Sequence, residues 1–326
     1  MILRDPSAYH GEKNNKPFFE GWYHKLITAN GQSLAIIPGI YRSGVNSHQF
    51  AFIMIFDGNK GDVFFEKFEV QKFSSSTSKY DLHIGSNYFS PHKMILNIKS
   101  EAVEIKGEVV ADNLKPWPVT LFEPGCMGWY AYIPTMECFH GILSMDHSLD
   151  GKLKFNGLNY DFSGGRGYME KDWGRNFPES WIWAQSNHFT KNNLSITASL
   201  ATIPWKNKVF AGFIIGLYYK NKFFRFTTYR NAVIKDINYD TKKFYWQLEQ
   251  KDMKLELTIK KGQNPGMLFA PNKTDMLPTV EEFLDGGIHC KLYQKDLVII
   301  DDYSIKCAVE FTGDTNQLIE MVNKNK

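Results

Sequence analysis

The chain has 326 residues, of which 43% are hydrophobic and 15% aromatic, and its formal net charge is +3 at pH 7. This length suits two domains with sizeable cores. Lysine and arginine are spread along the chain without the basic run of a nucleic-acid-binding arm, so we expect no nucleic-acid partner.

The chain start and the cysteines favour a cytoplasmic protein. The first residues, Met1 to Pro6, lack the basic and apolar regions of a signal peptide. The cysteines stand at positions 126, 138, 290 and 307 without a CxxC pair, which is typical of reduced thiols. The longest apolar stretch, residues 209–217, is too short to span a bilayer. We expect a protein that can touch a membrane surface without crossing it, in an oligomeric state that the sequence leaves open.

Short strands dominate the predicted secondary structure. Runs rich in β-branched and aromatic residues, separated by turns such as Asn30-Gly31, span 33–37, 49–56, 63–70, 94–98 and 103–110. Further runs span 195–202, 210–219, 223–228, 244–249, 253–259 and 288–294. Between two of them, Lys220-Asn221 is predicted to be a hairpin turn. Long 3.6-residue periodicity is missing, and the tail, residues 314–326, predicts one short helix. The predicted fold class is therefore all-β.

A short pattern, Phe-x-Glu-x-Trp, occurs twice at a separation near half the chain length. Its residues are Phe18, Glu20 and Trp22 in the first copy and Phe177, Glu179 and Trp181 in the second. Such an echo is expected when the second half repeats the architecture of the first. Closed antiparallel barrels of about eight strands hold one small apolar ligand. We therefore predict two tandem lipocalin-like antiparallel β-barrels, at residues 1–165 and 166–326, with a hydrophobic small molecule as the ligand.

Ionisable residues gather among aromatic neighbours in the middle of the chain. They are Glu137, His140, Asp146 and His147 in one segment, and Glu170, Lys171 and Asp172, followed by Trp173, in the next. Such groups are costly to bury unless they are paired or functional. A carboxyl in apolar surroundings keeps its proton, as a general acid must. Alternatively, Glu170, Lys171 and Asp172 pair at a domain junction and hold two barrels in register.

No metal site is predicted. Glu137, His140 and His147 lack the HxxxH and HExxH spacings of zinc ligands. His140 and His147 are seven positions apart, which places them on opposite faces of a single strand unless the chain turns at Gly141. Nucleotide-binding and serine-hydrolase motifs are also missing from the sequence.

Several motifs, in order, resemble tocopherol cyclases and their bacterial relatives. They are Phe19-Glu20-Gly21-Trp22-Tyr23, Met136-Glu137-Cys138-Phe139-His140-Gly141, Ser144-Met145-Asp146-His147, and Glu170-Lys171-Asp172-Trp173-Gly174 followed by Phe177-Pro178 and Trp181. The final third of the chain adds no matching motif. The resemblance implies two lipocalin-like barrels in tandem with neither an organic cofactor nor a metal. It also implies closure of the chromanol ring of a prenylated hydroquinone, or a related hydration.

The residues offer the chemistry that such a ring closure needs. A neutral carboxyl delivers a proton to an alkene, aromatic faces stabilise the tertiary cation, and a base accepts the phenol proton. Our hypothesis assigns Asp172 or Glu137 as the acid and His140 as orienting group or base. The predicted substrate-binding residues are Glu20, Trp22, Tyr23, Asp146, His147, Glu170, Trp173 and Trp181.

Two other functions remain open at this point. The same barrels could bind a hydrophobic small molecule without chemistry, or the tryptophans could form stacking platforms for a carbohydrate. A carboxyl without a cationic partner in an apolar pocket would favour catalysis. Pairing of Glu170 and Asp172 with Lys171, Arg166 or Arg175 would favour a binding or structural role instead. A shallow, wet groove with exposed tryptophan would favour a carbohydrate ligand.

Overall fold

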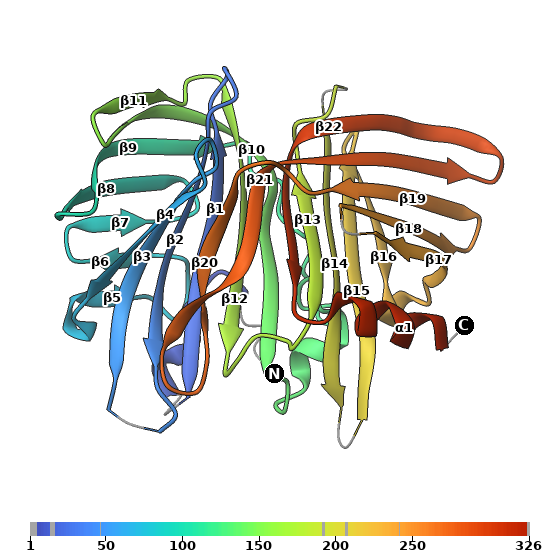
Figure 1. The fold of residues 1–326 in the computed structure, drawn as a ribbon, viewed down its shortest axis with the longest axis horizontal. Helices are drawn as coiled ribbons and strands as arrows, with labels where there is room; N and C mark the ends of the chain where they lie inside the picture. The colour runs from blue at the N-terminus through green and yellow to red at the C-terminus, as the bar shows by residue number, and fades with distance from the viewer. Residues whose placement is uncertain are drawn as a thin grey trace. The chain divides into compact units, whose positions relative to one another are not determined.

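The computed structural model describes residues 5–13, 17–45, 47–190, 193–205, 208–240 and 242–324. Over these residues the fold is almost entirely antiparallel β-structure, in one sheet of 12 strands and one of 10 (Figure 1). The all-β prediction is confirmed. The predicted tail helix is α1 (Thr315–Lys324), while residues 325–326 of that prediction lie outside the described residues. In the described part of the chain, no helix is long and apolar enough to cross a membrane.

The chain folds into two compact units. Unit 1 comprises Met1–Phe177 and Leu268–Thr279, and unit 2 comprises Pro178–Met267 and Val280–Lys326. A short segment from late in the sequence therefore belongs to unit 1. The limits expected for two folding domains, 1–165 and 166–326, stay a prediction.

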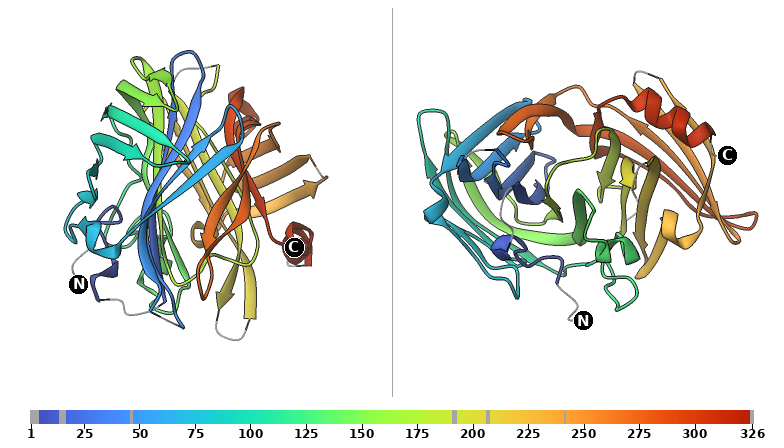
Figure 2. Two further views of the ribbon diagram at one scale, coloured as in Figure 1. Left: turned by 60° about the vertical axis from the view of Figure 1, so that its left-hand side comes forward. Right: turned by 90° about the horizontal axis from the view of Figure 1, so that it is seen from below.

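The sheet of unit 1 has the order β4-β3-β2-β1-β12-β10-β9-β8-β7-β6-β5, and β11 pairs with β10. Its strands are β1 (Phe18–Ile27), β2 (Ser33–Arg42), β3 (Gln49–Asp57), β4 (Asp62–Phe68), β5 (Phe73–Ser75), β6 (Leu82–Ile84), β7 (Asn87–Phe89), β8 (Lys93–Lys99), β9 (Glu104–Asp112), β10 (Cys138–Phe155), β11 (Leu158–Asp161) and β12 (Gly165–Gly174). The sheet curves around its core, as the right-hand view in Figure 2 shows. Its end strands, β4 and β5, are linked by the 3-10 turn η2 (Val70–Lys72), and no pairing that would close a barrel is found between them in the described residues.

The two faces of this sheet are buried to different extents along it. In β8 and β9 buried and more exposed residues alternate, as expected when one side meets solvent, whereas β1, β2 and β3 are buried on both sides. Trp22, Leu26, Ile36 and Met169 belong to the hydrophobic core of unit 1. We call the side on which they lie the core face, and the other side the reverse face.

Residues 268–279 lie against the reverse face of unit 1. The ring of Phe269 stacks on Phe65 of β4, with centroids 4.3 Å apart, and its backbone N–H donates to Met54 Sδ of β3 at 3.3 Å. The Tyr41 hydroxyl of β2 donates to the Asn272 carbonyl at 3.0 Å. This segment thus covers the end of the sheet at which β4 has no further neighbouring strand.

The second sheet belongs to unit 2, apart from the parts of β20 and β21 that lie within residues 268–279, and it repeats the strand order of the first. Its order is β16-β15-β14-β13-β22-β21-β19-β18-β17, with β20 pairing with β21. The strands are β13 (Trp181–Ser186), β14 (Leu194–Trp205), β15 (Lys208–Tyr219), β16 (Lys222–Thr227), β17 (Val233–Tyr239), β18 (Lys243–Gln250), β19 (Met253–Lys260), β20 (Pro265–Pro271), β21 (Met276–Gln294) and β22 (Leu297–Thr312). The predicted hairpin at Lys220-Asn221 joins β15 to β16, and positive φ angles of 48° and 63° suit a type I′ turn.

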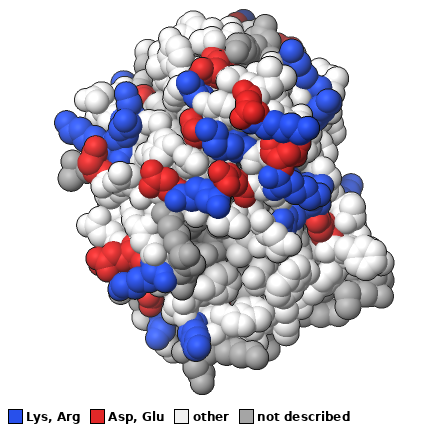
Figure 3. All heavy atoms as spheres, turned by 90° about the vertical axis from the view of Figure 1, so that its right-hand side faces the viewer, with Lys and Arg blue, Asp and Glu red and all other residues white. Residues whose placement is uncertain are grey.

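The exposed side chains of unit 2 carry mixed charge. Figure 3 shows lysine and arginine interleaved with aspartate and glutamate, without a large patch of one sign on that side. Cross-strand ion pairs account for part of this pattern, such as Lys291 with Asp301 at 3.1 Å and Lys235 with Glu249 at 3.4 Å. A solvated sheet face with neutralised charges is the physical result.

Candidate active site

The middle of the unit 1 sheet brings together residues from both predicted motif regions. β12 lies between β1 and β10, and Asp172 is directly opposite His140 of β10. Glu170, two residues earlier in β12, is opposite Tyr23 of β1. Because side chains two positions apart in a strand share a face, Glu170 and Asp172 both lie on the reverse face, where His140 meets them.

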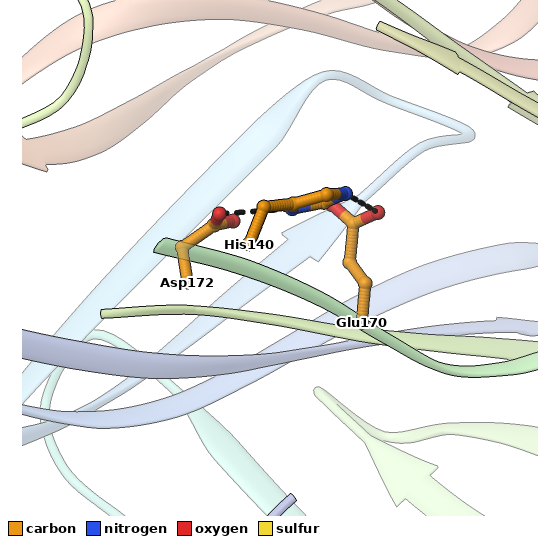
Figure 4. Close-up of side chains that lie close together, drawn as sticks. All are labelled: His140, Glu170 and Asp172. Atoms are coloured by element: carbon orange, nitrogen blue, oxygen red, sulfur yellow. Dashed lines mark hydrogen bonds and ion pairs between the residues drawn. The ribbon is translucent and has the colours of Figure 1, made fainter. Parts of the chain in front are cut away.

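The His140 ring lies between the two carboxylates (Figure 4). Its Nδ1 is 2.9 Å from Asp172 Oδ1, and its Nε2 is 3.7 Å from Glu170 Oε2. The Tyr168 hydroxyl donates to the same oxygen of Glu170 at 2.5 Å. The exposed fractions of the Glu170, His140 and Asp172 side chains are 8%, 17% and 25%, so Glu170 is the most buried of the three. We call Tyr168, Glu170, His140 and Asp172 the acid–histidine cluster.

The segment before β10 fixes the backbone of His140. The His140 N–H donates to Met127 Sδ at 3.1 Å, and the Cys126 thiol donates to the His140 carbonyl at 3.1 Å. Burial raises the pKa of the thiols of Cys126 and Cys138 well above its ordinary value. These thiols are therefore poor nucleophiles at neutral pH, and Cys126 instead helps to hold the His140 backbone in place.

His147 lies apart from the cluster although it shares a strand with His140. β10 runs without a break through Gly141, and register shifts follow on both sides of Ser144. His147 is opposite Gly167 on the core face, with its Nδ1 3.1 Å from Ser144 Oγ. Burial lowers the pKa of His147 to about 3, so its ring is neutral at physiological pH. The two histidines thus occupy opposite faces, as predicted, even though two register shifts lie between them.

Three further predicted residues, Glu20, Trp22 and Trp173, surround Lys171 on the core face. The Lys171 ammonium forms an ion pair with Glu20 and lies 4.6 Å from the ring centroid of Trp22 and 4.8 Å from that of Trp173. Burial lowers the pKa of Lys171 to about 8, and the neighbouring charge of Glu20 opposes this effect. Trp22 and Trp173 therefore each turn a ring face to the Lys171 ammonium rather than to the acid–histidine cluster.

The remaining predicted residues are dispersed. Tyr23 lies beside the cluster, since it is opposite Glu170. Asp146 forms an ion pair with Arg166 at 2.9 Å. The Glu137 side chain is exposed just before β10, outside the cluster. Trp181 belongs to unit 2, where its indole N–H donates to Glu310 Oε2 at 2.5 Å.

Tyr168 is the cluster member that sequence reasoning missed. It precedes Glu170 by two residues and Asp172 by four, so period-two alternation along a strand would have found it. The sequence interpretation stopped at the charged residues and did not treat residues 165–174 as one strand.

The cluster also contains three side chains of metal-ligating type, and one ligand atom from each of His140, Glu170 and Asp172 lies within 4.8 Å of the others. A single imidazole, however, gives one ion only one nitrogen. Here the two nitrogens face different carboxylates. A ring between two carboxylates is better arranged to pass a proton from one side to the other.

Comparison with known proteins identifies a family and relatives that this chain resembles. A family model described as tocopherol cyclase-like matches residues 112–313, which is more than half of the chain and includes His140, Glu170 and Asp172. The chloroplastic tocopherol cyclase of Zea mays is 23% identical over 384 residues, covering 95% of this chain and 78% of the maize protein.

Two solved structures are similar in fold. The protein CghA, in a crystal structure with Sch210972, has a TM-score of 0.56 at 10% identity, covering 91% of this chain and 89% of CghA. A Nitrosomonas europaea protein described as AttH has a TM-score of 0.52 at 13% identity, covering 94% of this chain and 97% of the other. At these identities the likeness concerns the fold alone.

Proposed function

Because this chain belongs to the tocopherol cyclase-like family, we propose that it catalyses the acid-driven cyclisation or hydration of a prenylated hydroquinone or related isoprenoid lipid, without an organic cofactor. The observation that carries the proposal is the His140 ring between the carboxylates of Asp172 and Glu170. Lipocalin-like barrels around an apolar ligand pocket are part of the same proposal.

The reaction needs one proton in and one proton out. A carboxyl proton adds to the less substituted carbon of a trisubstituted alkene, and the electron pair of the double bond forms the new C–H bond. The tertiary cation that results is captured by the phenol oxygen, which forms the C–O bond of the ring. The phenol then loses its proton to a base, so the net change is an isomerisation. If water captures the cation instead, the product is a hydrate.

We assign proton delivery to Glu170. Glu170 is the more buried of the two acids, and the Tyr168 hydroxyl and His140 Nε2 both lie at its Oε2 atom. Asp172 holds Nδ1 of His140, which directs Nε2 towards Glu170. His140 can therefore return the proton released by the phenol, as a general base in a preorganised relay. Asp172 remains the alternative donor, and Tyr23, directly opposite Glu170, is the nearest predicted aromatic wall for the cation.

The partners of the nearby cations favour catalysis over a purely structural role. Lys171 forms its ion pair with Glu20, and Arg166 pairs with Asp146. The Arg175 guanidinium donates to the Thr135 carbonyl at 3.1 Å. His140 is a basic group that meets both Glu170 and Asp172, one through each ring nitrogen, and an imidazole in this position can pass a proton between them.

The test is turnover of a synthetic hydroquinone that carries a trisubstituted prenyl chain, followed by mass spectrometry in D₂O. We expect one deuterium at the alkene carbon that receives the proton. Glu170→Gln, Asp172→Asn and His140→Asn should each lower kcat by about 10²- to 10⁴-fold, the usual contribution of general acid–base catalysis.

Glu101→Gln is the matched control, because it neutralises an exposed carboxyl of unit 1 outside the cluster and should leave kcat unchanged. Full turnover in both Glu170→Gln and Asp172→Asn would contradict the assignment. Tight binding of the hydroquinone without turnover by the unmodified protein would instead identify a non-catalytic binding protein for hydrophobic small molecules.

A further inference from the structure

Lys171 lies between the two acids of the cluster and points the other way. In β12 it separates Glu170 from Asp172, so alternation places its side chain on the core face. It is directly opposite Trp22 of β1 and Gly141 of β10. Glu170 and Asp172 flank Lys171 in β12, and His140 immediately precedes Gly141 in β10. One cross-strand row therefore forms the back of the acid–histidine site.

The Lys171 side chain is fully buried and its ammonium is saturated with partners. It donates to the carbonyls of Ala8 and Pro6, the latter at 3.1 Å, and pairs with the buried carboxylate of Glu20. His10 Nδ1 lies 2.9 Å from Nζ. An ammonium has only three N–H donors. These contacts therefore leave Lys171 no freedom to reach another group.

Most of these partners come from the N-terminal strap, which we define as residues 5–10. The Trp22 indole N–H donates to the Ser7 carbonyl at 2.9 Å, and the His10 backbone N–H donates to the Glu20 carboxylate at 3.0 and 3.1 Å. The His10 ring stacks on Trp173 with centroids 4.3 Å apart and planes 5° from parallel. The strap is therefore fastened to β1 and β12 by hydrogen bonds and stacking.

The strap also packs against β10 beside His140. A Cβ added at Gly141 would lie 3.2 Å from Pro6 Cβ and 3.3 Å from the Trp173 ring, which is tighter than ordinary van der Waals contact. Hence the strap contacts β10 and β12, which carry the cluster, and the neighbouring strand β1, on the face opposite to the cluster. A change in its packing would tilt these strands relative to one another.

We propose that Lys171 is a positioning residue that, with Glu20 and His10, clamps the N-terminal strap to the back of β1, β12 and β10 and so holds Glu170, Asp172 and His140 in their catalytic geometry. The catalytic part of this inference rests on the function proposed above, whereas the geometric part does not. A displacement of about 1 Å at reacting groups can cost about 10²-fold in rate. Supporting contacts of this kind decide whether a site holds its geometry.

The experiment compares the double variant Lys171→Met/Glu20→Gln with the unmodified protein. Removing both charges avoids leaving one buried charge without its partner. Hydrogen exchange of the peptide that contains residues 5–12 reports release of the strap. The ¹⁵N resonances of the His140 ring, assigned with His140→Asn, report the cluster geometry without requiring any substrate. We expect faster exchange, shifted His140 resonances and a kcat lowered by about 10- to 100-fold, with KM changed less than about threefold.

Tyr80→Phe is the matched control. It removes a buried hydrogen bond to His24 Nε2, 2.7 Å long, on the same core face, and keeps the ring that stacks on Trp22. It should move neither the His140 resonances nor kcat. If the double variant does not fold, His10→Phe replaces it, since a phenyl ring keeps the stack on Trp173 and removes the polar contacts of the ring.

Release of the strap with unchanged His140 resonances and kcat would overturn the proposal, and so would a strap that stays protected in the folded double variant. If the unmodified protein turns over no substrate, the proposed function fails, but the His140 resonances still decide the positioning role.

Discussion

The buried histidines of unit 1 make its stability sensitive to mild acid. Burial lowers the pKa of both His24 and His147 from an ordinary value of 6.5 to about 3. In the unfolded chain the same rings take up protons below pH 6.5. The unfolded state then binds more protons, so the free energy of unfolding falls as the pH falls from about 6.5 towards 3. The slope is about 1.4 kcal/mol per pH unit for each histidine.

Urea unfolding between pH 7.5 and pH 5 measures this effect above the range in which most carboxylates titrate. We expect the unfolding free energy to decrease over this interval. His24→Gln should flatten the decrease, because glutamine can still bond the Tyr80 hydroxyl but does not titrate. An equally steep decrease in His24→Gln, or a flat profile in the unmodified protein, would contradict the prediction.

At the residue scale the sequence predicts the kinds of groups in the site better than their partners. Asp172 and His140 were both assigned to catalysis, and the structure brings them to 2.9 Å. The motif Glu170-Lys171-Asp172, however, was treated as one candidate ion-pair group. Alternation separates it into two faces, and Lys171 finds its partner in Glu20. That partner is 151 positions away in the chain, at a distance that no local spacing rule covers.

At the element scale most hydrophobic runs were predicted well, but β22, which begins Leu297-Val298-Ile299-Ile300, was missed, and so were the polar strands. The runs predicted at 49–56 and 253–259 match β3 and β19 closely, because β-branched and aromatic residues fill them. β10 and β12, which carry the cluster, were not predicted as strands. Their charged and glycine-rich sequences lack a strong β signal, and the neighbouring strands supply the pairing that holds them extended.

Gly167 shows how closely β12 packs on its core face. A Cβ at this position would lie 2.2 Å from His147 Nε2, nearer than atoms can approach without movement of the ring. We expect Gly167→Ala to lower the free energy of unfolding by about 1–3 kcal/mol, the usual cost of overpacking. Equilibrium urea unfolding at pH 7.5 measures the change.

The control for this substitution is Gly287→Ala in β21. Its new Cβ would meet neighbouring atoms only at 3.6 Å and beyond, which is ordinary contact. The free energy of unfolding should then change by no more than about 0.5 kcal/mol. Equal destabilisation by the two alanines would show that loss of glycine itself, rather than the contact with His147, is responsible.

At the scale of the whole molecule the chain repeats a topology without repeating its chemistry. β1 to β4 and β13 to β16 occupy equivalent places in the two sheets, in agreement with the echo between the halves of the sequence. Where unit 1 places His140 opposite Asp172, unit 2 places Glu282 opposite Glu310. A pair of acids lacks the imidazole that can carry a proton between them. The two sheets thus share a strand order, as a repeat between the halves of the sequence predicts. The chemistry depends on single residues that this repeat does not preserve.

No sequence pattern predicts that residues 268–279 return to unit 1. Phe269 stacks on Phe65 of the end strand β4, and its backbone N–H donates to Met54 Sδ of β3, so it covers apolar side chains on the reverse face of these two strands. We expect Phe269→Ala to lower the free energy of unfolding by about 1–3 kcal/mol, less than for a fully buried phenylalanine because the ring is only half-buried. Hydrogen exchange should rise in peptides from β3 and β4.

Phe122→Ala serves as the control, since its side chain is 84% exposed and its loss should change stability by no more than about 0.5 kcal/mol. Unchanged exchange in β3 and β4 would mean that the sheet of unit 1 holds its end strand without the returning segment.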